Sequence, residues 1–298
     1  MKNALTFDVE EYFHAEAFAR TLRPEEWPGL ASRVVDTTQR LLDMLDYANT
    51  RATFFVLGWV AERYPALVQE IAARHHEIAC HGYGHQMINR QTRQQFAEDV
   101  RRAKATIEDA AGVAVIGYRA PTFSVIRGTL WSLEVLWENG FLYDSSIFPI
   151  VHDRYGIPDA PRFPYRVPMI NVNGSANGNG NAHGHAIAEF PLSTISVLGH
   201  RLPIAGGGYF RLLPYAVTRR LIQRLNAREH QPVIVYLHPW ELDVHQPRMR
   251  VGWLTQMRHS VNTHTTEAKL RCLLKDFRFA PVREILTQGG VLTARETR

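Results

Sequence analysis

Short apolar runs alternate along this chain with longer segments in which apolar residues recur every three or four positions. The short runs predict strands over 4–9, 52–57, 77–80, 115–119, 189–192 and 233–238. The periodic segments predict helices over 34–45, 59–73, 92–111, 129–138, 214–229 and 266–276. Strands that alternate with helices in this way are typical of an α/β protein with a mostly parallel sheet.

Six or more β–α repeats favour a barrel, in which functional residues gather at the carboxyl ends of the strands. The clearest helix boundary lies at Thr92, which fits a capping box with Gln95, and Gly112 ends the same helix. After Pro239 the chain is less regular and richer in Arg and His. We therefore expect residues 241–298 to form an extension packed on a barrel of residues 1–240. Residues 171–186 hold almost no large apolar side chain, which predicts a mobile surface loop.

Composition narrows the functional classes without choosing one. The 298 residues are 45% hydrophobic, which is enough for a large core, and the formal net charge is +5. We see no basic run with interleaved aromatic residues, so we expect no nucleic-acid partner. The two cysteines exclude a disulfide scaffold. No apolar stretch reaches the roughly 20 residues of a membrane helix. We therefore expect a cytoplasmic protein, either free in the cytoplasm or bound peripherally at the inner membrane.

Two acidic residues at the end of the first predicted strand share one face of it. Asp8 and Glu10 are two positions apart, so their side chains point the same way, whereas Val9 points into the opposite layer. Two buried carboxylates repel each other unless a cation lies between them. A metal ion held by one, with the other free to act as a base, resolves that conflict. Solvated acids at a strand end remain the alternative.

The predicted strand 77–80 runs directly into a pair of histidines. His81 and His85 are separated by a segment with Gly82 and Gly84, which disfavour a helix, so we expect a turn that still brings both rings to one ion. Two imidazoles and one carboxylate leave coordination positions open for water, as in hydrolytic metal sites.

Two further polar residues end apolar strands. Arg119 follows 115–118, where a buried guanidinium needs a carboxylate partner such as Asp8. His238 ends the apolar run 233–237, and Pro239 turns the chain away from the strand. Each residue taken alone could be structural, but the ordered set of strand-end residues is specific.

That set resembles the NodB-type polysaccharide deacetylases, carbohydrate esterase family 4. The family motifs Thr-Phe-Asp-Asp, His-x-x-x-His, Arg-x-Pro and Leu-His are similar to Thr6-Phe7-Asp8, to His81 and His85, to Arg119-Ala120-Pro121 and to Leu237-His238. The resemblance implies a distorted or incomplete (β/α) barrel. It also implies a divalent metal, zinc first and cobalt, nickel or manganese otherwise, and removal of acetyl groups from N-acetylated sugars.

The resemblance further implies a role for each matching residue. Asp8 would be the catalytic base, held by Arg119, and His238 the general acid. Val9 replaces the second Asp of the family motif, so Glu10 would join His81 and His85 as a metal ligand. The family residue that orients the acid has no clean match, and Asp144 is the nearest candidate.

Other segments extend the resemblance to a subgroup encoded with exopolysaccharide synthesis in bacteria that use exosortase sorting. These segments are 206–215, 238–241 and 270–285. A partner in that synthesis machinery is therefore expected, and the substrate is an N-acetylated oligo- or polysaccharide. Aromatic residues stack on sugar rings, which makes Phe123, Tyr209 and Trp240 candidate substrate contacts, together with Arg211. A backbone N–H within 121–123 is a candidate for stabilising the oxyanion.

Two other functions remain open at this point. One is a metal-independent amidohydrolase of the allantoinase-like branch, which shares the Asp-x-Glu start but lacks the complete histidine pair. The other is a non-catalytic carbohydrate-binding subunit of an export complex, which the substitution by Val9 would allow.

Overall fold

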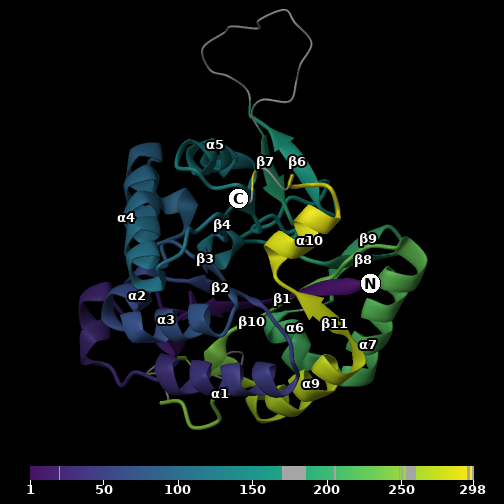
Figure 1. Cartoon of the computed structure of the whole chain (residues 1–298), viewed down its shortest axis with the longest axis horizontal. Coiled ribbons are helices and arrows are strands. Elements are labelled where there is room, and N and C mark those ends of the chain that lie inside the picture. The colour runs from purple at the N-terminus through teal and green to yellow at the C-terminus, as the bar shows by residue number, and fades with distance from the viewer. Residues whose placement is uncertain are drawn as a thin grey trace, which may run out of the picture.

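The structure is a computed structural model that describes residues 1–19, 21–169, 186–204, 206–247, 249, 251–252, 260–293 and 296. A large sheet crosses the molecule, with its strands in the order β10-β1-β2-β3-β4-β5-β7-β6 and β11 paired to the start of β1 (Figure 1). All its pairings are parallel except β6 with β7. The strands are β1 (Lys2–Val9), β2 (Thr53–Val56), β3 (Glu77–Cys80), β4 (Gly117–Tyr118), β5 (Tyr143–Asp144), β6 (Tyr165–Pro168), β7 (Ala186–Glu189), β10 (Ile234–Leu237) and β11 (Arg278–Ala280). The predicted α/β class with a mostly parallel sheet is confirmed.

The strand order of the large sheet has two ends. Within the described residues, backbone pairing does not join β6 to β10, the two ends of the strand order. A separate hairpin, β8 (Thr194–Val197) with β9 (His200–Pro203), lies outside the large sheet. The helices around the sheet are α1 (Val34–Tyr47), α2 (Gly58–Arg63), α3 (Pro65–Ala73), α4 (Arg93–Ala111), α5 (Trp131–Glu138), α6 (Gly207–Leu212), α7 (Tyr215–Arg224), α9 (Thr263–Asp276) and α10 (Val282–Gln288).

Most predicted elements are present, and proline explains two of the differences. The helix expected over 59–73 is two helices, α2 and α3, because Pro65 has no N–H and begins a new helix after Tyr64. The strand expected over 189–192 is β7, which ends at Glu189, since Pro191 cannot donate to a sheet ladder. Helix α4 matches its prediction closely: Thr92 accepts from the Gln95 N–H, and Gly112 ends the helix at a φ of 67°.

The core lies in two layers because successive side chains of a strand point to opposite faces. Phe7, Val9 and Phe54 belong to the larger cluster, which also includes buried residues of the outer helices. Phe55, between Phe54 and Val56, belongs to the second cluster on the other face. Asp8 pairs with Phe55 across β1 and β2, so its carboxylate lies on that second face.

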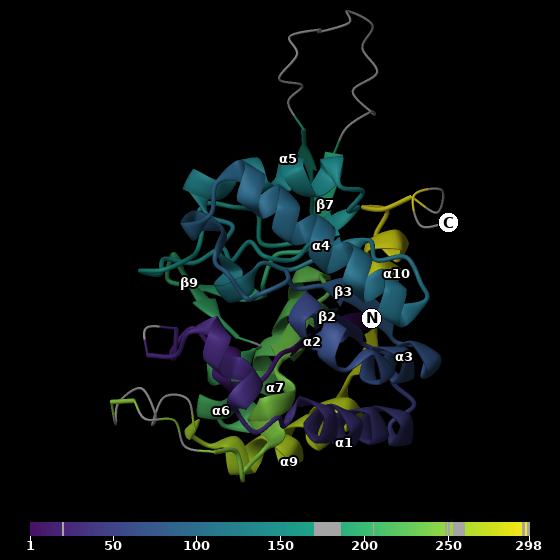
Figure 2. The ribbon, with the colours of Figure 1, turned by 90° about the vertical axis from the view of Figure 1, so that its left-hand side faces the viewer.

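The amino and carboxyl ends of the parallel strands lie on opposite sides of the molecule in the view turned by 90° (Figure 2). The beginning of β1 and helix α10 lie on the right, and the purple segment that follows β1 lies on the left. That segment includes two 3-10 helices, η1 (Tyr12–His14) and η2 (Pro24–Gly29). The carboxyl ends of the parallel strands therefore face left, and the amino ends face right.

The C-terminal part of the chain is integrated into the sheet. Strand β11 pairs with the first residues of β1, and α10 follows directly. The division into 1–240 and 241–298 stays a prediction, and the loop expected over 171–186 lies, apart from residue 186, outside the described residues. No helix of the described residues has both the length and the apolar character needed to cross a membrane.

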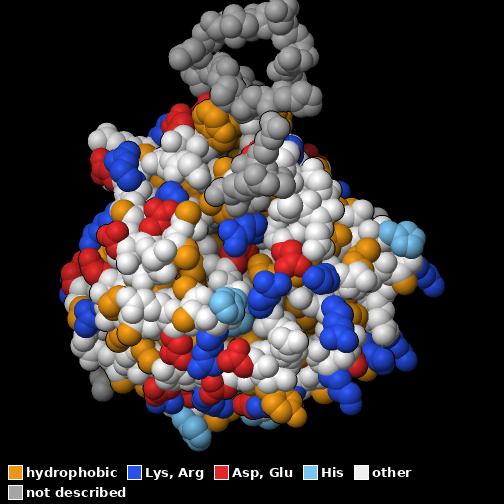
Figure 3. Space-filling view, viewed as in Figure 1, with side chains coloured by type: hydrophobic (Ala, Val, Ile, Leu, Met, Phe, Trp, Pro, Cys, Tyr) orange, Lys and Arg blue, Asp and Glu red, His pale blue; other side chains and the backbone are white. Residues whose placement is uncertain are grey.

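Charge is unevenly spread over the face in view in Figure 3. Lys and Arg side chains gather on the right, over the region of α7 in Figure 1, and both signs mix at the lower left. Helix α7 carries three arginines, and one of them, Arg219, pairs with Asp276 of α9 at 2.9 Å.

Candidate metal and catalytic site

Three side chains that follow β1 and β3, the strands on either side of β2, form a candidate metal centre. Glu10, His81 and His85 each offer a ligand atom, and these atoms all lie within 4.8 Å of one another. The His85 Nε2 is 2.9 Å from the Glu10 Oε2. Among the described residues, this is the one group of three or more His, Cys, Asp or Glu side chains whose ligand atoms lie this close together.

The chain brings both histidines together through a turn, as expected, and not through a helix. His81 continues the ladder of β3, because its N–H donates to the Val56 carbonyl at 2.9 Å. Gly82 then adopts a φ of 76° and His85 a φ of 51°. Left-handed conformations are accessible to glycine but uncommon for histidine, so the backbone at His85 is held by its surroundings.

The surroundings of these three side chains suit a divalent cation. The Arg119 carbonyl lies 2.8 Å from the His81 Nδ1. This contact fixes the ring and leaves Nε2 as the atom that can bind a metal ion. The Trp240 Nε1 donates to the Glu10 Oε1 at 3.1 Å. The other oxygen, Oε2, is buried and faces the His85 Nε2. A buried carboxylate beside two imidazoles is the donor set that zinc and similar metals take.

The pKa shifts agree with that interpretation. Burial lowers the pKa of His81 to about 4, so the imidazole is neutral and able to coordinate. Burial opposes ionisation of Glu10, but His85, His238 and His81 outweigh it and hold the pKa of Glu10 well below its usual range. Glu10 and His81 are therefore in their metal-binding protonation states at neutral pH.

Asp8 and Arg119 form a buried ion pair next to this centre. The Arg119 Nη1 donates to the Asp8 Oδ1 at 2.7 Å and to the Thr6 Oγ1 at 2.8 Å. Arg119 is fully buried, and its other nitrogens donate to the carbonyl and hydroxyl of Ser145, each at 3.0 Å. Its guanidinium also lies 4.0 Å from the centre of the Phe55 ring. This network fixes one oxygen of Asp8 and leaves Oδ2 directed to His238.

His238, at the end of β10, completes the cluster of strand-end residues. Its Nε2 lies 3.9 Å from the Asp8 Oδ2 and 3.7 Å from the Glu10 Oε1. Its Nδ1 is 3.1 Å from the Glu241 Oε2. Burial opposes protonation of this imidazole, but the Glu241 hydrogen bond and the charges of Glu10 and Asp8 raise the pKa of His238 to about 9.

Glu241 is the residue that orients His238, and sequence reasoning missed it. The expectation for Asp144 is wrong, because the His238 Nδ1 faces Glu241, whereas Asp144 accepts from the Ser146 hydroxyl at 2.6 Å. A signal was available: Glu241 stands three residues after His238 at the start of η7 (Pro239–Leu242), where a Glu accepts from the backbone N–H of the capping residue.

Arg211 also lies differently from the expected substrate contact. Its Nε is 2.7 Å from the Glu241 Oε1, and the two side chains are 5% and 0% exposed. The guanidinium is therefore committed to a buried carboxylate. Arg211, Glu241 and His238 form a row of charged side chains, and His238 at its end lies beside Asp8 and Glu10.

The three aromatic candidates occupy different positions. The Trp240 ring stacks on His238 with 4.9 Å between centroids, and its indole N–H serves Glu10. Phe123 packs edge-to-face on Tyr236 at 4.9 Å and is 8% exposed, while Tyr209 in α6 is half-buried. Contact with substrate stays a prediction for all three.

The oxyanion donor expected within 121–123 stays a prediction, and one N–H group of this turn after β4 already has a backbone partner. Phe123 donates to the Ala120 carbonyl at 3.0 Å within η4 (Pro121–Phe123). Thr122 and Phe123 have φ values of 55° and 52°. Two consecutive left-handed residues without glycine indicate local strain, which clusters at functional sites.

Comparisons with known proteins agree with this arrangement. Residues 4–136 match the family model described as polysaccharide deacetylase. These residues therefore belong to the polysaccharide deacetylase family. Residues 145–287 match a second model, described as a domain of unknown function (DUF3473).

Curated relatives of the deacetylase domain share only part of their length with this chain. A peptidoglycan-N-acetylglucosamine deacetylase of Bacillus cereus is 30% identical over 101 residues, which cover 34% of this chain and 37% of that protein. A bifunctional xylanase/deacetylase of Pseudobutyrivibrio xylanivorans is 29% identical over 109 residues, or 36% of this chain and 18% of that protein.

A solved structure is similar over nearly the whole chain. It is a polysaccharide deacetylase from Mycobacterium smegmatis, described as putative, with a TM-score of 0.59 and 24% identity. The similarity covers 97% of this chain and 91% of that one. At this level of identity it supports the fold.

The site straddles the two matched segments. The deacetylase domain contributes Asp8, Arg119 and the Glu10, His81 and His85 cluster. The segment of unknown function contributes His238, Trp240, Glu241 and Arg211. The second segment is therefore the other half of one site.

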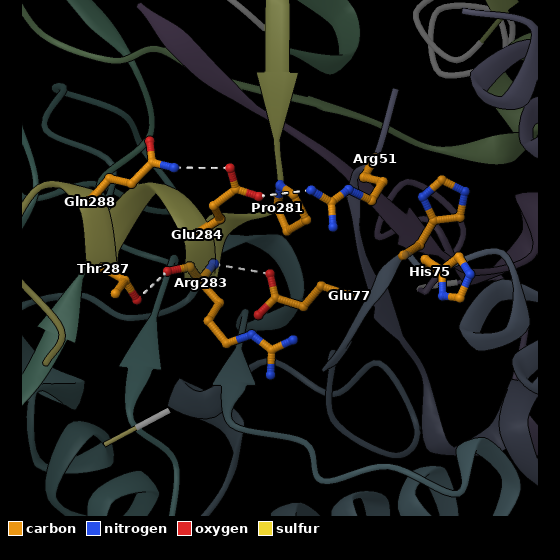
Figure 4. Close-up of a pocket in the computed structure, with 9 residues that line it drawn as sticks. Arg51, His75, Glu77, Pro281, Arg283, Glu284, Thr287 and Gln288 are labelled. Atoms are coloured by element: carbon orange, nitrogen blue, oxygen red, sulfur yellow. Dashed lines mark hydrogen bonds and ion pairs between the residues drawn. The ribbon is translucent and has the colours of Figure 1, made fainter. Parts of the chain in front are cut away.

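A different pocket lies at the amino ends of the strands. It has a volume of about 390 Å³ and is lined by residues that include Arg51, Glu77 and Glu284 (Figure 4). Its polar groups largely satisfy one another: the Arg51 Nη2 donates to the Glu284 Oε2 at 3.2 Å, and the Arg283 N–H donates to the Glu77 Oε2 at 3.1 Å. Because it faces the opposite end of the sheet, it takes no part in the strand-end cluster.

Proposed function

We propose that this chain is a metal-dependent hydrolase that removes N-acetyl groups from the N-acetylhexosamine units of a polysaccharide. The observation that supports this most directly is the convergence of Asp8 and His238 on the Glu10, His81 and His85 cluster. The chain spans between 18% and 37% of the length of the first curated relatives it matches, whose names specify deacetylation.

The cluster of Glu10, His81 and His85 would hold the divalent ion. Such an ion, when bound, polarises the acetyl carbonyl and increases the acidity of a coordinated water. Zinc is the leading choice because two of the three ligands are imidazoles. The neutral state of His81 and the hydrogen bond from Trp240 to Glu10 keep these ligands oriented.

The chain's own residues would carry the proton transfers. Asp8 takes a proton from the attacking water through Oδ2, because Arg119 occupies Oδ1. His238 then donates a proton from Nε2 to the departing nitrogen, which is a poor leaving group without it. Glu241 on Nδ1 holds the ring so that Nε2 faces the cluster.

The finer identity of the substrate is part of the same proposal. We infer an exopolysaccharide, or its lipid-linked precursor, made by synthesis machinery that acts in or at the cytoplasm. The similarity of 206–215, 238–241 and 270–285 to the exosortase-associated subgroup supports this choice.

Acetate release from N-acetylglucosamine oligomers tests the proposal. We expect Asp8→Asn and His238→Ala each to lower the turnover number by about 10² to 10⁴, the range for a lost general base or acid. His76→Gln is the matched control, because His76 is a buried histidine at the amino end of β3, remote from the cluster.

Three results would contradict the proposal in different ways. Equal release by all four proteins would refute the assigned roles. Undiminished release after exhaustive chelation would instead favour the metal-independent amidohydrolase. Oligomer binding without release would favour a non-catalytic carbohydrate-binding subunit.

A further inference from the structure

The segment between β1 and α1 forms a pocket beside the candidate metal centre. The pocket has a volume of about 450 Å³, within the range of about 300–1,000 Å³ typical of ligand sites. Phe13, His14 and Trp27 come from this segment, Trp59 comes from α2, and the ligand His85 lines the same pocket. The pocket therefore adjoins the candidate metal centre at His85.

His14 presents an unpaired hydrogen-bond donor there. The Glu11 N–H donates to the His14 Nδ1 at 3.2 Å, so the proton of the neutral ring is on Nε2. Nε2 is buried and has no hydrogen-bond partner, and the whole residue is 3% exposed. Burial lowers the pKa of His14 to about 3, which keeps the ring neutral.

An unsatisfied buried N–H is costly, on the order of 1–3 kcal/mol. Such groups are rare in folded proteins and call for a specific partner. His14 cannot turn away to find one, because its ring packs against Trp27 at 4.3 Å and against Trp59 at 4.9 Å between centroids. The donor is thus fixed in the wall of the pocket, without a partner among the described residues.

The remaining walls suit a neutral, hydroxyl-rich ring. Trp27 and Trp59 provide apolar aromatic surface, and their rings cross edge-to-face at 5.8 Å. Glu16 and Arg90, which also line the pocket, form a two-pronged ion pair at 2.6 Å and 3.4 Å, with Arg90 half exposed. Paired charges of this kind add hydroxyl-binding groups with little net charge.

We propose that this pocket is a subsite for the hexosamine unit adjacent to the one that loses its acetyl group. The His14 Nε2–H would donate to an oxygen of that adjacent unit. The inference rests on the proposed function, because it takes the cluster of Asp8 and His238 as the reaction centre. It adds that a chain of linked sugars binds better than a single sugar.

Binding to an inactive protein tests the subsite without turnover. In the Asp8→Asn protein we expect the tetramer of N-acetylglucosamine to change tryptophan fluorescence and to bind more tightly than the monomer. Adding His14→Phe keeps an aromatic ring between Trp27 and Trp59 but removes the donor. We expect it to weaken tetramer binding by about tenfold, which is the loss of about 1.4 kcal/mol, and to leave monomer binding unchanged.

Two further variants separate the donor from general packing. Trp27→Leu should weaken tetramer binding and remove part of the fluorescence change. Among the described residues, His76 is the other buried histidine whose Nε2 has no partner, and it lies at the opposite end of the sheet, so His76→Gln should change neither property. Thermal melts identify any variant that fails to fold, and Trp27→Leu then decides in place of His14→Phe.

Acetate release by otherwise unmodified protein separates the two proposals. A higher KM of His14→Phe for the tetramer alone, with the turnover number kept, supports the subsite. Acetate release with no dependence on chain length, or equal losses for monomer and tetramer, overturns the subsite and leaves the deacetylase. Tetramer-selective binding that depends on His14, with no acetate released by the unmodified protein, overturns the deacetylase and leaves the pocket as a sugar site.

Discussion

Glu241 is the residue on which the geometry of the proposed acid depends. One of its oxygens faces His238 and the other faces Arg211, and its side chain is fully buried. Burial opposes its ionisation, but Arg211 and His238 lower the pKa of Glu241 overall. It therefore joins a structural ion pair to the reactive histidine.

Separating these two roles requires two variants. Glu241→Gln removes the negative charge from a buried pair, and we expect a loss of about 3–5 kcal/mol in the free energy of unfolding because the buried Arg211 charge loses its carboxylate partner. Arg211→Met combined with Glu241→Gln should recover most of that stability. Acetate release should stay about 10- to 100-fold low in both, since neither holds His238 with a carboxylate.

Urea unfolding and steady-state kinetics on the same preparations measure the two effects. If the double variant regained full activity along with its stability, Glu241 would be merely structural.

The sequence predicted the residues of this site that stand at strand ends. Asp8, His81 and Arg119 each follow an apolar run, and parallel strands bring such positions to one edge. His14 and Glu241 were missed because each belongs to a 3-10 turn, where no periodicity indicates which side chains are buried. Their role depends on contacts across the fold.

At the level of elements, the pairing of β5 with β7 places two acids next to each other. Asp144 pairs with Glu189 in register, and both are fully buried. Burial raises the pKa of each, and the neighbouring Asp144 carboxyl raises that of Glu189 further. Burial and the Asp144 carboxyl therefore favour the protonated form of Glu189, and the Ile147 N–H donates to its Oε1 at 3.0 Å.

This pair gives stability a predictable pH dependence. The pKa of Glu189 is higher in the folded state than in the unfolded state, where it is about 4.3. Its contribution is therefore fully present below that value and is lost as pH rises, by up to about 1.4 kcal/mol per pH unit. Glu189→Gln keeps both the acceptor for Ile147 and a donor for Asp144 but does not titrate.

We accordingly expect Glu189→Gln to gain stability over the unmodified protein between pH 5 and pH 8. The measurement is the free energy of unfolding of both proteins in urea across that range. A difference that stays constant with pH would show that Glu189 is ionised in the folded protein.

The predicted bounds of the elements were most accurate where the sequence marks both ends of the element. Helix α4 has caps at both ends, and β3 has the bounds that its apolar run indicates. Strands β5 and β11 have two and three residues, which is too short for an alternation to be recognised. They are strands because longer neighbours offer hydrogen bonds, which is a tertiary effect.

For the whole molecule, metal binding is linked to folding. A ligand that binds only the folded state stabilises it by about 2.7 kcal/mol at a hundred times its dissociation constant. We expect zinc added to chelated protein to raise the melting temperature by several degrees. The gain should be absent in a His81→Ala/His85→Ala variant and intact in His76→Gln. An equal gain in all three proteins would place zinc elsewhere.

The α/β class could be predicted from the alternation of strands and helices. The pairing of the first strand with a strand more than two hundred residues later could not. Sequence patterns describe segments one at a time, and the pairing of β1 with β10 joins residues 4–7 to residues 234–237. That pairing is what brings His238 to Asp8.

The same pairing has a consequence for synthesis on the ribosome. Strand β1 emerges long before β10, and at about 5–20 residues per second its partner follows only after about 10 to 50 s. During that interval residues 4–7 of β1 lack one flanking strand, so that edge of the sheet stays open until β10 is made. A translation product that stops short of β10 would carry both imidazoles and both carboxylates, and nothing to protonate the amine.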